Sequence, residues 1–253
     1  MSESISIKKG VDVQLNIESL AFGGMGVAHL NDIVTFVKNA IPGQKVTARI
    51  TKKRSSYLEA QSLEVLNDSP YAVDALCEHF SDCGGCTFQN LNYEQQIFAK
   101  EIQVKDIFQR IGGFFDVPNE PILGCKEIFH YRNKMEFSFS NYEYVPRSVK
   151  ERSQAKIVVG LHVPEKWDQI LNINECHIQA PIANEILRYI KKITGKLEAY
   201  NIRKHTGFLR NVIIRVSANT DEVMVNFITN GEDENSQLPI RDSVNTKFSN
   251  ITS

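Results

Sequence analysis

The sequence has no long hydrophobic run. Its 253 residues are 42% hydrophobic, yet no stretch approaches the roughly 18 uninterrupted apolar residues that span a bilayer. The N-terminal residues MSESISIKKGVDV lack the apolar centre of a secretory signal. We therefore expect a cytoplasmic protein without a membrane span, and we expect no disulfide framework because cytosolic thiols stay reduced.

A net charge of either sign is also missing. Lys and Arg total 29 and Asp and Glu total 30, which leaves a formal charge of −1. The whole chain therefore gives no argument for a nucleic-acid partner, and such an argument must come from local patches. One basic run lies between Lys45 and Arg54 and another between Arg188 and Lys204. Taken alone, either run is equally compatible with a solvated face.

The glycine-rich loops that bind nucleotide phosphates are absent as well. No GxGxxG stretch occurs, and the cluster FGGMG at residues 22–26 lacks the lysine and Ser/Thr of a Walker loop. Strand-like sequence follows this cluster, so we interpret it as a hairpin or bulge. An exposed Phe22 at such a turn would suit a barrel that binds nucleic acid.

The chain divides into an N-terminal β region and a longer α+β region. From Gly10 to Leu66, about five short β-type runs separated by turn residues predict a small barrel, which we assign to residues 1–68. The Asn-Asp-Ser-Pro stretch at residues 67–70 is interpreted as a linker. Residues 69–253 carry four strand patterns and two amphipathic stretches, which predict an α+β domain.

The first amphipathic stretch predicts a helix over residues 92–112. Asn92 is its expected N-cap, Gln95 stands in the capping-box position, and two glycines end it. Its apolar stripe needs an apolar partner and includes Ile97, Val104, Phe108 and Ile111.

A second helix is expected over residues 181–193. The strand patterns are MEFSFS, KIVVGLHV, RNVIIRV and EVMVNFI. The last two are expected to pair as a hairpin across the turn at residues 219–222.

Cysteine is scarce but unevenly placed. Three of the five cysteines lie within CEHFSDCGGC at residues 77–86, and an odd total does not suit a bridged framework. A structural zinc site usually takes paired CxxC knuckles, whereas only Cys83 and Cys86 form one. Three clustered thiolates with one remote cysteine favour an iron–sulfur cube over zinc. A redox dithiol is the third alternative, and it lacks a βαβ context.

Two remote cysteines compete for the fourth position. Cys176 lies in NECHIQAP, a polar turn before a helix, and suits a ligand. Cys125 follows PILG and is expected to be a buried, inert small hydrophobe. His79 and His177 are the nitrogen alternatives for zinc.

Four motifs, in order along the chain, resemble one enzyme family. They are C-x5-C-G-G-C-x2-Q at 77–89, HYRNKMEFSF at 130–139, NECHIQ at 174–179 and HTGFLRNVIIR at 205–215. The sequence resembles the RNA uracil-C5 methyltransferases, and within them the branch that carries a 4Fe-4S cluster and modifies 23S ribosomal RNA. The resemblance implies an OB-like TRAM domain at residues 1–68 and a central domain with a cluster loop at 77–89. It implies the cluster ligands Cys77, Cys83, Cys86 and Cys176.

The resemblance also implies a reaction. A cysteine thiolate adds to C6 of a flipped uracil, C5 takes a methyl group from S-adenosylmethionine, and a carboxylate removes the C5 proton. Those groups belong to a C-terminal Rossmann-like domain whose glycine loop and nucleophile segment we do not find here. We therefore expect a chain truncated before that domain, with no catalytic or cofactor-binding residue, in which S-adenosylmethionine binds only the longer parent.

Such a fragment is expected to bind RNA without catalysing. The helix at 92–112 would pack on the missing domain in the family, so here its stripe is expected to be exposed or to drive self-association. The alternatives are a zinc- or iron–sulfur-containing RNA-binding adaptor and a ferredoxin-like electron carrier. The carrier leaves the basic barrel unexplained.

The expected RNA contacts fall into two groups. On the barrel, phosphate contacts would give affinity and salt dependence with little sequence choice, and they comprise Lys45, Arg49, Lys52, Lys53 and Arg54. The contacts nearer the implied active site comprise Arg132, Asn133, Lys134, Arg210 and Arg215. For Arg215, the alternation in NVIIRV equally allows a solvated sheet face. The cluster is expected to shape the RNA-binding surface, because methyl transfer involves no net redox change.

Overall fold

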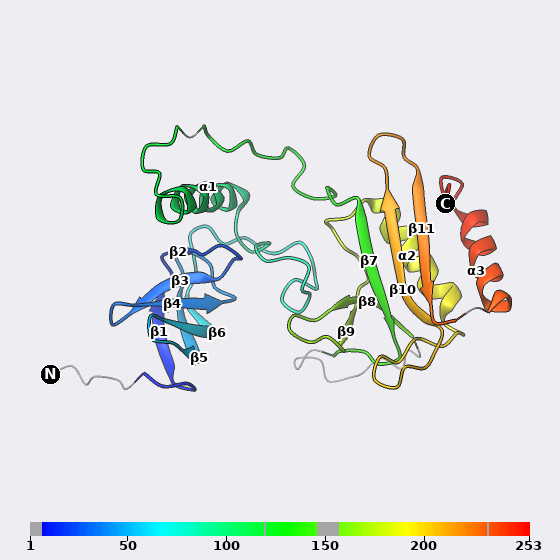
Figure 1. The fold of residues 1–253 in the computed structure, drawn as a ribbon, viewed down its shortest axis with the longest axis horizontal. Coiled ribbons are helices and arrows are strands. Elements are labelled where there is room, and N and C mark those ends of the chain that lie inside the picture. The colour runs from blue at the N-terminus through cyan, green and yellow to red at the C-terminus, as the bar shows by residue number, and fades with distance from the viewer. Residues whose placement is uncertain (1–6, 119, 146–156, 232) are drawn as a thin grey trace. The chain divides into compact units, whose positions relative to one another are not determined.

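The computed structural model describes residues 7–118, 120–145, 157–231 and 233–253. They form two compact units (Figure 1). Unit 1 joins the described residues up to 75 with 87–125, and unit 2 joins 76–86 with 126–253. The chain therefore enters unit 2, returns to unit 1 and enters unit 2 again. This division differs from the single boundary expected at residue 68, because the segment after the cysteine loop packs with the N-terminal strands.

Unit 1 contains a six-stranded sheet in the order β1-β5-β6-β4-β3-β2. All neighbours are antiparallel except β4 and β6. Val13 of β1, Ala28 of β3 and Ile50 of β5 share one buried core, so the sheet curls around a single interior. The strands are β1 (Asp12–Asn16), β2 (Ser19–Leu20), β3 (Gly26–Leu30), β4 (Ile33–Lys38), β5 (Lys45–Lys53) and β6 (Tyr57–Asn67).

Tight turns fix the register of these strands. Asn31 and Asp32 both adopt positive φ, 50° and 63°, in the two-residue turn between β3 and β4. The FGGMG cluster connects β2 to β3 as a hairpin loop, with Gly23 and Gly24 at positive φ. The hairpin interpretation is confirmed, and Phe22 at its tip is 82% exposed.

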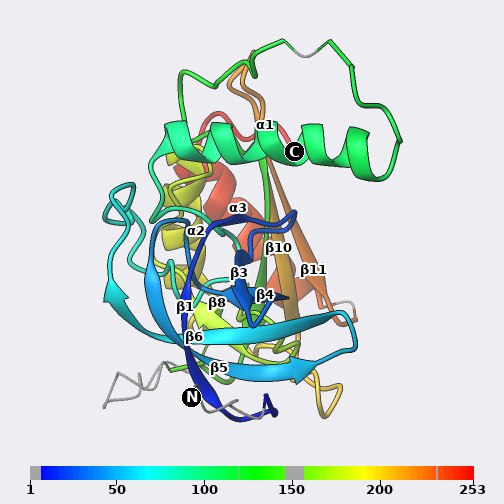
Figure 2. The same ribbon diagram turned by 90° about the vertical axis from the view of Figure 1, so that its left-hand side faces the viewer.

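Helix α1 (Tyr93–Arg110) begins and ends close to the predicted residues. The Asn92 side chain accepts the Gln95 N–H at 2.9 Å, which is the predicted cap. Gln103 donates to the carbonyl oxygens of Leu20 and Ala21, each at 3.1 Å, and holds α1 beside β2 (Figure 1). Figure 2 shows α1, in green, next to the blue strands of the same unit. None of the helix residues is buried. Its exposed apolar side chains are Phe98, Ile102, Val104, Ile107 and Phe108, followed by Ile111 just after its end.

Unit 2 contains a five-stranded antiparallel sheet in the order β11-β10-β7-β8-β9. Period-2 alternation sends Met135, Phe137 and Phe139 of β7 to one face, where they join a core with residues of both helices. The elements are β7 (Lys134–Ser140), β8 (Val158–His162), β9 (Ile170–Asn172), α2 (Pro181–Thr194), β10 (Leu209–Val216), β11 (Val223–Thr229) and α3 (Glu234–Lys247).

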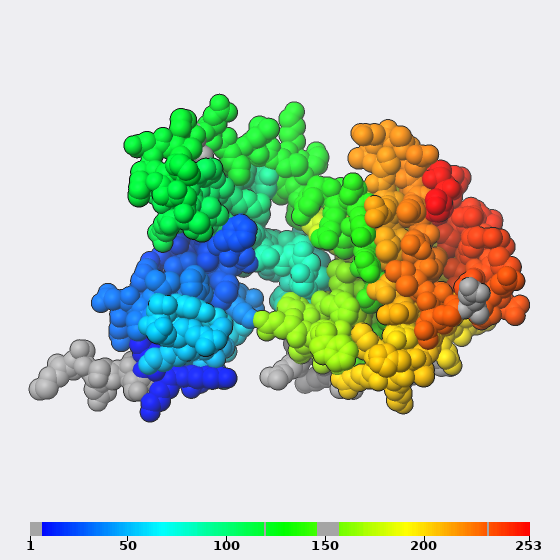
Figure 3. Space-filling view, viewed as in Figure 1, coloured from blue at the N-terminus to red at the C-terminus, as the bar shows by residue number. Residues whose placement is uncertain are grey.

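Two elements of unit 2 were not predicted. Helix α3 carries Pro239 in its interior and has a polar sequence, so neither propensity nor periodicity indicates it. It is stabilised by Ile240 and Val244, which are buried in the shared core. Figure 3 shows α3, in red, packed beside the orange hairpin of β10 and β11. Strand β9 has only three residues and is defined by its pairing with β8.

One predicted strand is described only in part, and no membrane-spanning helix is found among the described residues. Residue 156, the first residue of the expected strand KIVVGLHV, lies outside the described residues. Among the helices that the structure describes, none is both long and apolar enough to cross a membrane.

Candidate functional site

Four of the five cysteines belong to unit 2. Cys77, Cys83 and Cys86 lie on the loop at residues 76–86, and Cys176 lies just before α2. Cys83 and Cys86 pack on the core that contains the buried Cys176. No cysteine of the chain is in a disulfide. Cys83, Cys86 and Cys176 therefore border one core, and the electrostatic influence of Cys86 and Cys176 reaches Cys77.

The surroundings of these thiols disfavour their ionisation. Burial raises the pKa of Cys83 to about 11 and also raises the pKa of Cys77 and of Cys176. The neighbouring cysteines add to the rise at Cys77 and Cys83. Without a bound metal ion the thiols of Cys77, Cys83 and Cys176 are therefore protonated at neutral pH, whereas metal ligation needs thiolates.

Backbone N–H groups point at three of the sulfurs. Gly85 donates to the Sγ of Cys83 at 3.3 Å. Backbone hydrogen bonds from His79 to Cys77, and from residues 178 and 179 to Cys176, lower the pKa of these thiols against the effect of burial. Such donors stabilise sulfur that carries negative charge, as in thiolates bound to iron.

Asn184 of α2 is only 2% exposed, and its side chain holds the Cys176 segment in place. Its Oδ1 accepts the backbone N–H of Cys176 at 2.9 Å and the side-chain amide of Gln179 at 2.5 Å. Its amide donates to the Cys176 carbonyl oxygen at 3.1 Å. The cysteine loop is joined to the same segment, because Asn174 donates its backbone N–H to the His79 ring at 3.1 Å. The four cysteines are therefore carried by two segments that bond directly to each other.

The described residues show no preformed site for a metal ion. In the part of the chain that the structure describes, no three His, Cys, Asp or Glu side chains are grouped so as to hold a metal ion. A zinc ion needs its four ligands within about 2.0–2.3 Å of one point. In a 4Fe-4S cube each cysteine binds a different iron, so the ligands surround a larger volume. The cluster therefore stays a prediction from the cysteine spacing.

Cys125 does not match its predicted environment. It was expected to be a buried hydrophobe, but it is exposed and belongs to unit 1. Its backbone N–H donates to the Tyr93 hydroxyl at 2.8 Å. The preceding Ile122 and Leu123 are exposed as well, so the apolar residues of PILG lie on the surface and do not enter a core.

The HYRNK segment lies beside the NECHIQ segment. His130 donates its backbone N–H to the carbonyl oxygen of His177 at 2.9 Å, and Arg132 donates to that of Ile178 at 2.8 Å. The charge of Arg132 also lowers the pKa of Cys176, although burial of this thiol dominates. Two motifs that are about forty residues apart in the sequence are therefore physically joined.

Three of the predicted RNA contacts converge on one cavity of about 410 Å³. Lys134 and Arg215 are register partners on β7 and β10, and Val216 donates its N–H to the Asn133 carbonyl oxygen at 2.9 Å. Asn133, Lys134 and Arg215 all line this cavity, together with Glu222. Arg210, at the opposite end of β10, does not.

The barrel cations are less free than their number indicates. Arg49 donates from Nε and Nη2 to the carboxylate of Asp12 at 2.7 and 2.8 Å, and Lys52 is 2.7 Å from Glu59. The guanidinium of Arg49 holds the pKa of Asp12 below its usual value. Lys53 donates to a backbone carbonyl oxygen at 3.1 Å. A phosphate would therefore have to compete with carboxylates for Arg49 and Lys52. Lys45 and Arg54 complete this predicted group.

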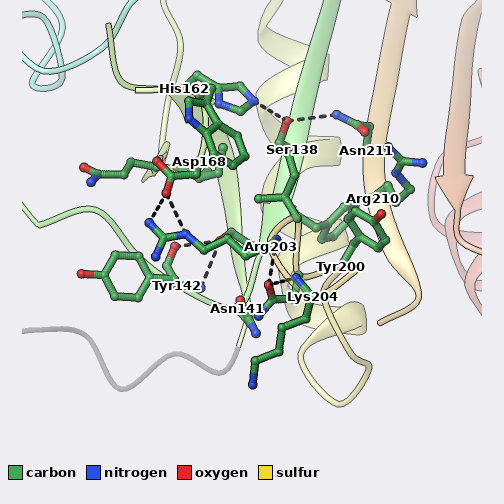
Figure 4. A pocket seen from close by; sticks show the side chains of 17 residues that line it. Ser138, Asn141, Tyr142, His162, Asp168, Tyr200, Arg203, Lys204, Arg210 and Asn211 are labelled. Atoms are coloured by element: carbon green, nitrogen blue, oxygen red, sulfur yellow. Dashed lines mark hydrogen bonds and ion pairs between the residues drawn. The ribbon is translucent and has the colours of Figure 1, made fainter. Parts of the chain in front are cut away.

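A second cavity, of about 590 Å³, was missed by sequence reasoning (Figure 4). It lies at one end of the unit 2 sheet and is lined by three loops and the edges of β7, β8 and β10. Arg203 and Lys204 line it, and they belong to the basic run that sequence alone could not separate from a solvated face. Its aromatic residues, such as Trp167, come from loops that have no periodic pattern. Only Arg210 had been predicted as a contact.

Comparisons with known proteins agree with the motifs. The TRAM domain family matches residues 8–63. An RNA methyltransferase of Clostridium tetani is 35% identical over 234 residues, which cover 90% of this chain and 48% of that protein. One of Bacillus cereus is 34% identical over 249 residues and covers 98% of this chain and 52% of its own length. The chain thus spans about half the length of the curated relatives it matches.

A solved structure matches as well. The Pyrococcus abyssi tRNA (uracil-54, C5)-methyltransferase in complex with S-adenosyl-L-homocysteine superposes with a TM-score of 0.59 and 26% identity. The match covers 87% of this chain and 46% of that protein. The inferred TRAM domain and the resemblance to RNA methyltransferases are confirmed by these matches.

The same matches contradict two predictions. The chain was expected to lack the methyltransferase domain and to be a non-catalytic RNA-binding fragment, and both expectations are wrong. RNA methyltransferases align with up to 98% of the chain, and the tRNA enzyme superposes on 87% of it. The predictions had relied on a missing glycine fingerprint and on where the sequence stops. Neither feature says what the aligned residues do in an enzyme.

Proposed function

We propose that this chain serves in the methylation of uracil C5 in structured RNA, with S-adenosylmethionine as the methyl donor. The observation that carries the proposal is the convergence of the HYRNK, NECHIQ and LRNVIIR segments in unit 2, which brings cations, amides and the Cys176 thiol together. The relative solved with S-adenosyl-L-homocysteine supports the donor, and its name supports uracil C5 as the acceptor.

The proposed chemistry follows from the electronic structure of uracil. C5 attacks a methyl group only after a nucleophile has added to C6. The reaction ends with loss of the C5 proton and of that nucleophile. S-adenosylmethionine supplies the electrophilic methyl group. The base must leave its stack to expose C5 and C6. We assign a role in that event to four residues of this chain. Lys134, Arg215 and Asn133 would hold the RNA backbone. Arg132 would contact the RNA from a position that depends on its hydrogen bond to the Cys176 segment.

We also propose that Cys77, Cys83, Cys86 and Cys176 hold a 4Fe-4S cluster. The support is their common location, the absence of disulfides among them and the N–H groups directed at three of the sulfurs. The cluster would tie the cysteine loop to the NECHIQ segment and so fix the HYRNK segment that is bonded to it. Its role is structural, because methyl transfer consumes no electrons. Unbridged thiols and an RNA substrate suit the cytoplasm.

The proposed RNA is 23S ribosomal RNA, which the cysteine motif supports. The second candidate is transfer RNA, because the solved relative acts on tRNA according to its description. The test is methyl transfer from labelled S-adenosylmethionine to 23S and transfer RNA that lack C5-methyluridine, with nucleoside mass spectrometry of the product. Methyluridine in 23S RNA alone is expected. Methyluridine in tRNA alone would retain the reaction and refute the ribosomal target, and none in either RNA would refute the proposed function.

The cluster needs its own test. Protein purified without oxygen is analysed for iron, zinc and acid-labile sulfide, and about four irons and four sulfides per chain are expected. Cys176→Ser should lose them, and the matched control Cys125→Ser should keep them. One zinc without sulfide would refute the cluster while leaving the methylation proposal intact.

A further inference from the structure

The 590 Å³ cavity lies on the face of the unit 2 sheet opposite the helices. Met135, Phe137 and Phe139 of β7 enter the helix-covered core, so by strand alternation Ser138 points to the other face. Ser138 lines the cavity beside its register partner Asn211 of β10. The cavity therefore lies mainly on the polar side of the sheet, and Phe139 of the core also contributes to its lining.

Large aromatic side chains stand exposed at this cavity. Trp167, on the loop between β8 and β9, is 63% exposed, and Tyr142, just after β7, is 51% exposed. Both line the cavity. A folded protein gains nothing from exposing such rings, whereas flat aromatic faces in a groove are what unstacked bases bind to.

Cations surround these rings. Three basic side chains line the cavity, Arg203, Lys204 and Arg210, against the single carboxylate of Asp168, which leaves a formal charge of +2. Arg203 donates to Asp168 from Nε at 2.9 Å and also from Nη2, so three of its five N–H donors are left for another anion (Figure 4). A phosphate could bind there without breaking the ion pair.

Local backbone geometry positions all three of these cations. Asn201 caps its own turn, because its Oδ1 accepts the N–H groups of Arg203 and Lys204, each at 3.0 Å. Arg210 is the extra residue where the register between β10 and β11 shifts, so a β-bulge turns it outward. Its guanidinium lies over the ring of Tyr200, 4.5 Å from the centroid. The positive rim is thus built by the backbone and is not a random surface distribution.

The inner wall of the cavity offers hydrogen-bonding groups. Asn211 donates to the hydroxyl of Ser138 at 3.0 Å, and that hydroxyl is 3.2 Å from Nε2 of His162. This row of an amide, a hydroxyl and an imidazole presents both donors and acceptors, as does the edge of a pyrimidine base. The rings, the positive rim and this wall together match the face of a base, its phosphate and its edge.

We propose that this cavity binds one unstacked nucleotide of a single-stranded RNA segment. The base stacks on Trp167 or Tyr142, its edge meets Ser138 and Asn211, and its phosphate is held by Arg203 and Lys204. The inference rests on the proposed function for the presence of an RNA substrate. It adds a second contact surface, separate from the cavity lined by Lys134 and Arg215, and it selects single-stranded over duplex RNA, because paired bases cannot enter a cavity.

Trp167 is the only tryptophan of the chain, so its fluorescence reports on this cavity alone. The full chain is titrated with a short fluorescein-labelled oligouridylate, and RNA anisotropy and tryptophan quenching are recorded in parallel. Both signals should give the same dissociation constant. A blunt RNA duplex of equal length should quench Trp167 far less at equal occupancy.

Substitutions then separate stacking from charge. Tyr142→Ala and Trp167→Ala should each weaken oligouridylate binding about 5- to 100-fold if that ring carries the base, and Trp167→Phe should restore most of the affinity. Arg203→Ala should weaken binding and flatten its salt dependence. The matched control is Arg241→Ala, which removes another exposed, carboxylate-paired arginine, on α3, and should change neither.

The outcomes distinguish this inference from the proposed function. Oligouridylate binding without quenching, unaffected by Tyr142→Ala, Trp167→Ala and Arg203→Ala, would overturn the nucleotide site and leave RNA binding elsewhere on the chain. Equal quenching by the duplex would overturn the single-strand selectivity. Failure of both RNAs to bind, with no methyluridine formed in either natural RNA, would overturn the proposed function as well.

Discussion

Arg132 donates its backbone N–H to the carbonyl oxygen of Ile178 at 2.8 Å, two residues beyond Cys176. A predicted RNA-contacting arginine and a proposed cluster ligand are therefore on neighbouring, hydrogen-bonded segments. Any change that moves the Cys176 segment also moves Arg132. This relation predicts that the proposed cluster site and the proposed RNA contact depend on each other mechanically.

Replacement of Asn184 tests that dependence. Asn184→Ala removes three hydrogen bonds around Cys176 and leaves buried backbone and amide groups unpaired. We expect a loss of about 2–3 kcal/mol in unfolding free energy from urea denaturation, together with reduced iron retention. Asn226→Ala, at an exposed strand position, is the control and should stay within about 0.5 kcal/mol. Unchanged stability and iron content would show that Asn184 does not position the segment.

Breaking the ion pair between Asp12 and Arg49 on the barrel should increase RNA affinity. Asp12→Ala releases Arg49 from its carboxylate partner, so one more cation becomes available to phosphate. The slope of log affinity against log salt should steepen by about 0.7. The double variant Asp12→Ala/Arg49→Ala should lose this gain. If Asp12→Ala has no effect on affinity or slope, Arg49 is not on the RNA-binding surface.

We expect Lys191 of α2 to make the free energy of unfolding depend on pH. Burial lowers its pKa to about 8, while its ammonium group donates to Asn172 and to the carbonyl oxygen of Ile173. Between pH 8 and about 10.5 the unfolded chain holds the lysine proton and the folded chain has lost it, so stability rises with pH in this window. The gain is on the order of 1–3 kcal/mol.

The measurement compares the protein with Lys191→Met, since subtraction cancels the titration of every other group. The difference in unfolding free energy should shift in favour of the unsubstituted protein as pH rises from 8 to 10. A difference that stays constant over this range would mean that Lys191 keeps an ordinary pKa in the folded state.

Thiol alkylation should distinguish Cys125 from the buried cysteines in metal-free protein. Cys125 is exposed, whereas Cys176 is buried and burial raises the pKa of Cys83 to about 11. Because the thiolate is the reactive form, we expect iodoacetamide to label Cys125 first at pH 7.5. Peptide mass spectrometry measures the order. Faster labelling of Cys83 than of Cys125 would contradict the described environment of the cysteine loop. Cys125→Ser is the control, because it should abolish the fastest phase of alkylation.

The exposed stripe of α1 predicts self-association. Val104, Phe108 and Ile111 are exposed apolar side chains on or just beyond one helix, and their burial against a second copy would remove them from water. Sedimentation equilibrium should show a concentration-dependent dimer, which Phe108→Glu shifts toward monomer. Lys100→Glu, at an exposed polar position of the same helix, is the control for added negative charge. A monomer at all concentrations would refute the prediction.

Local signals in the sequence were sufficient for much of the fold. Asn92 and Gln95 indicate the start of α1 because a cap is a contact between near neighbours. The hairpin turn at Asn31 and Asp32 depends on the backbone preferences of two residues. Helix α3 was missed because it contains Pro239, and only burial of Ile240 and Val244 against distant strands makes it stable.

The sequence by itself determined the kinds of chemistry available. The cysteine spacing predicted a sulfur site, and four ordered motifs indicated a family, because residue identity and spacing are properties of the chain. Only the tertiary structure decided which residues meet: Arg132 beside Cys176, Lys134 beside Arg215, and Trp167 beside Arg203 at one cavity. These pairs are separated by about 35 to 80 residues, and long-range pairing is set by how sheets and helices share a core, which no local pattern encodes.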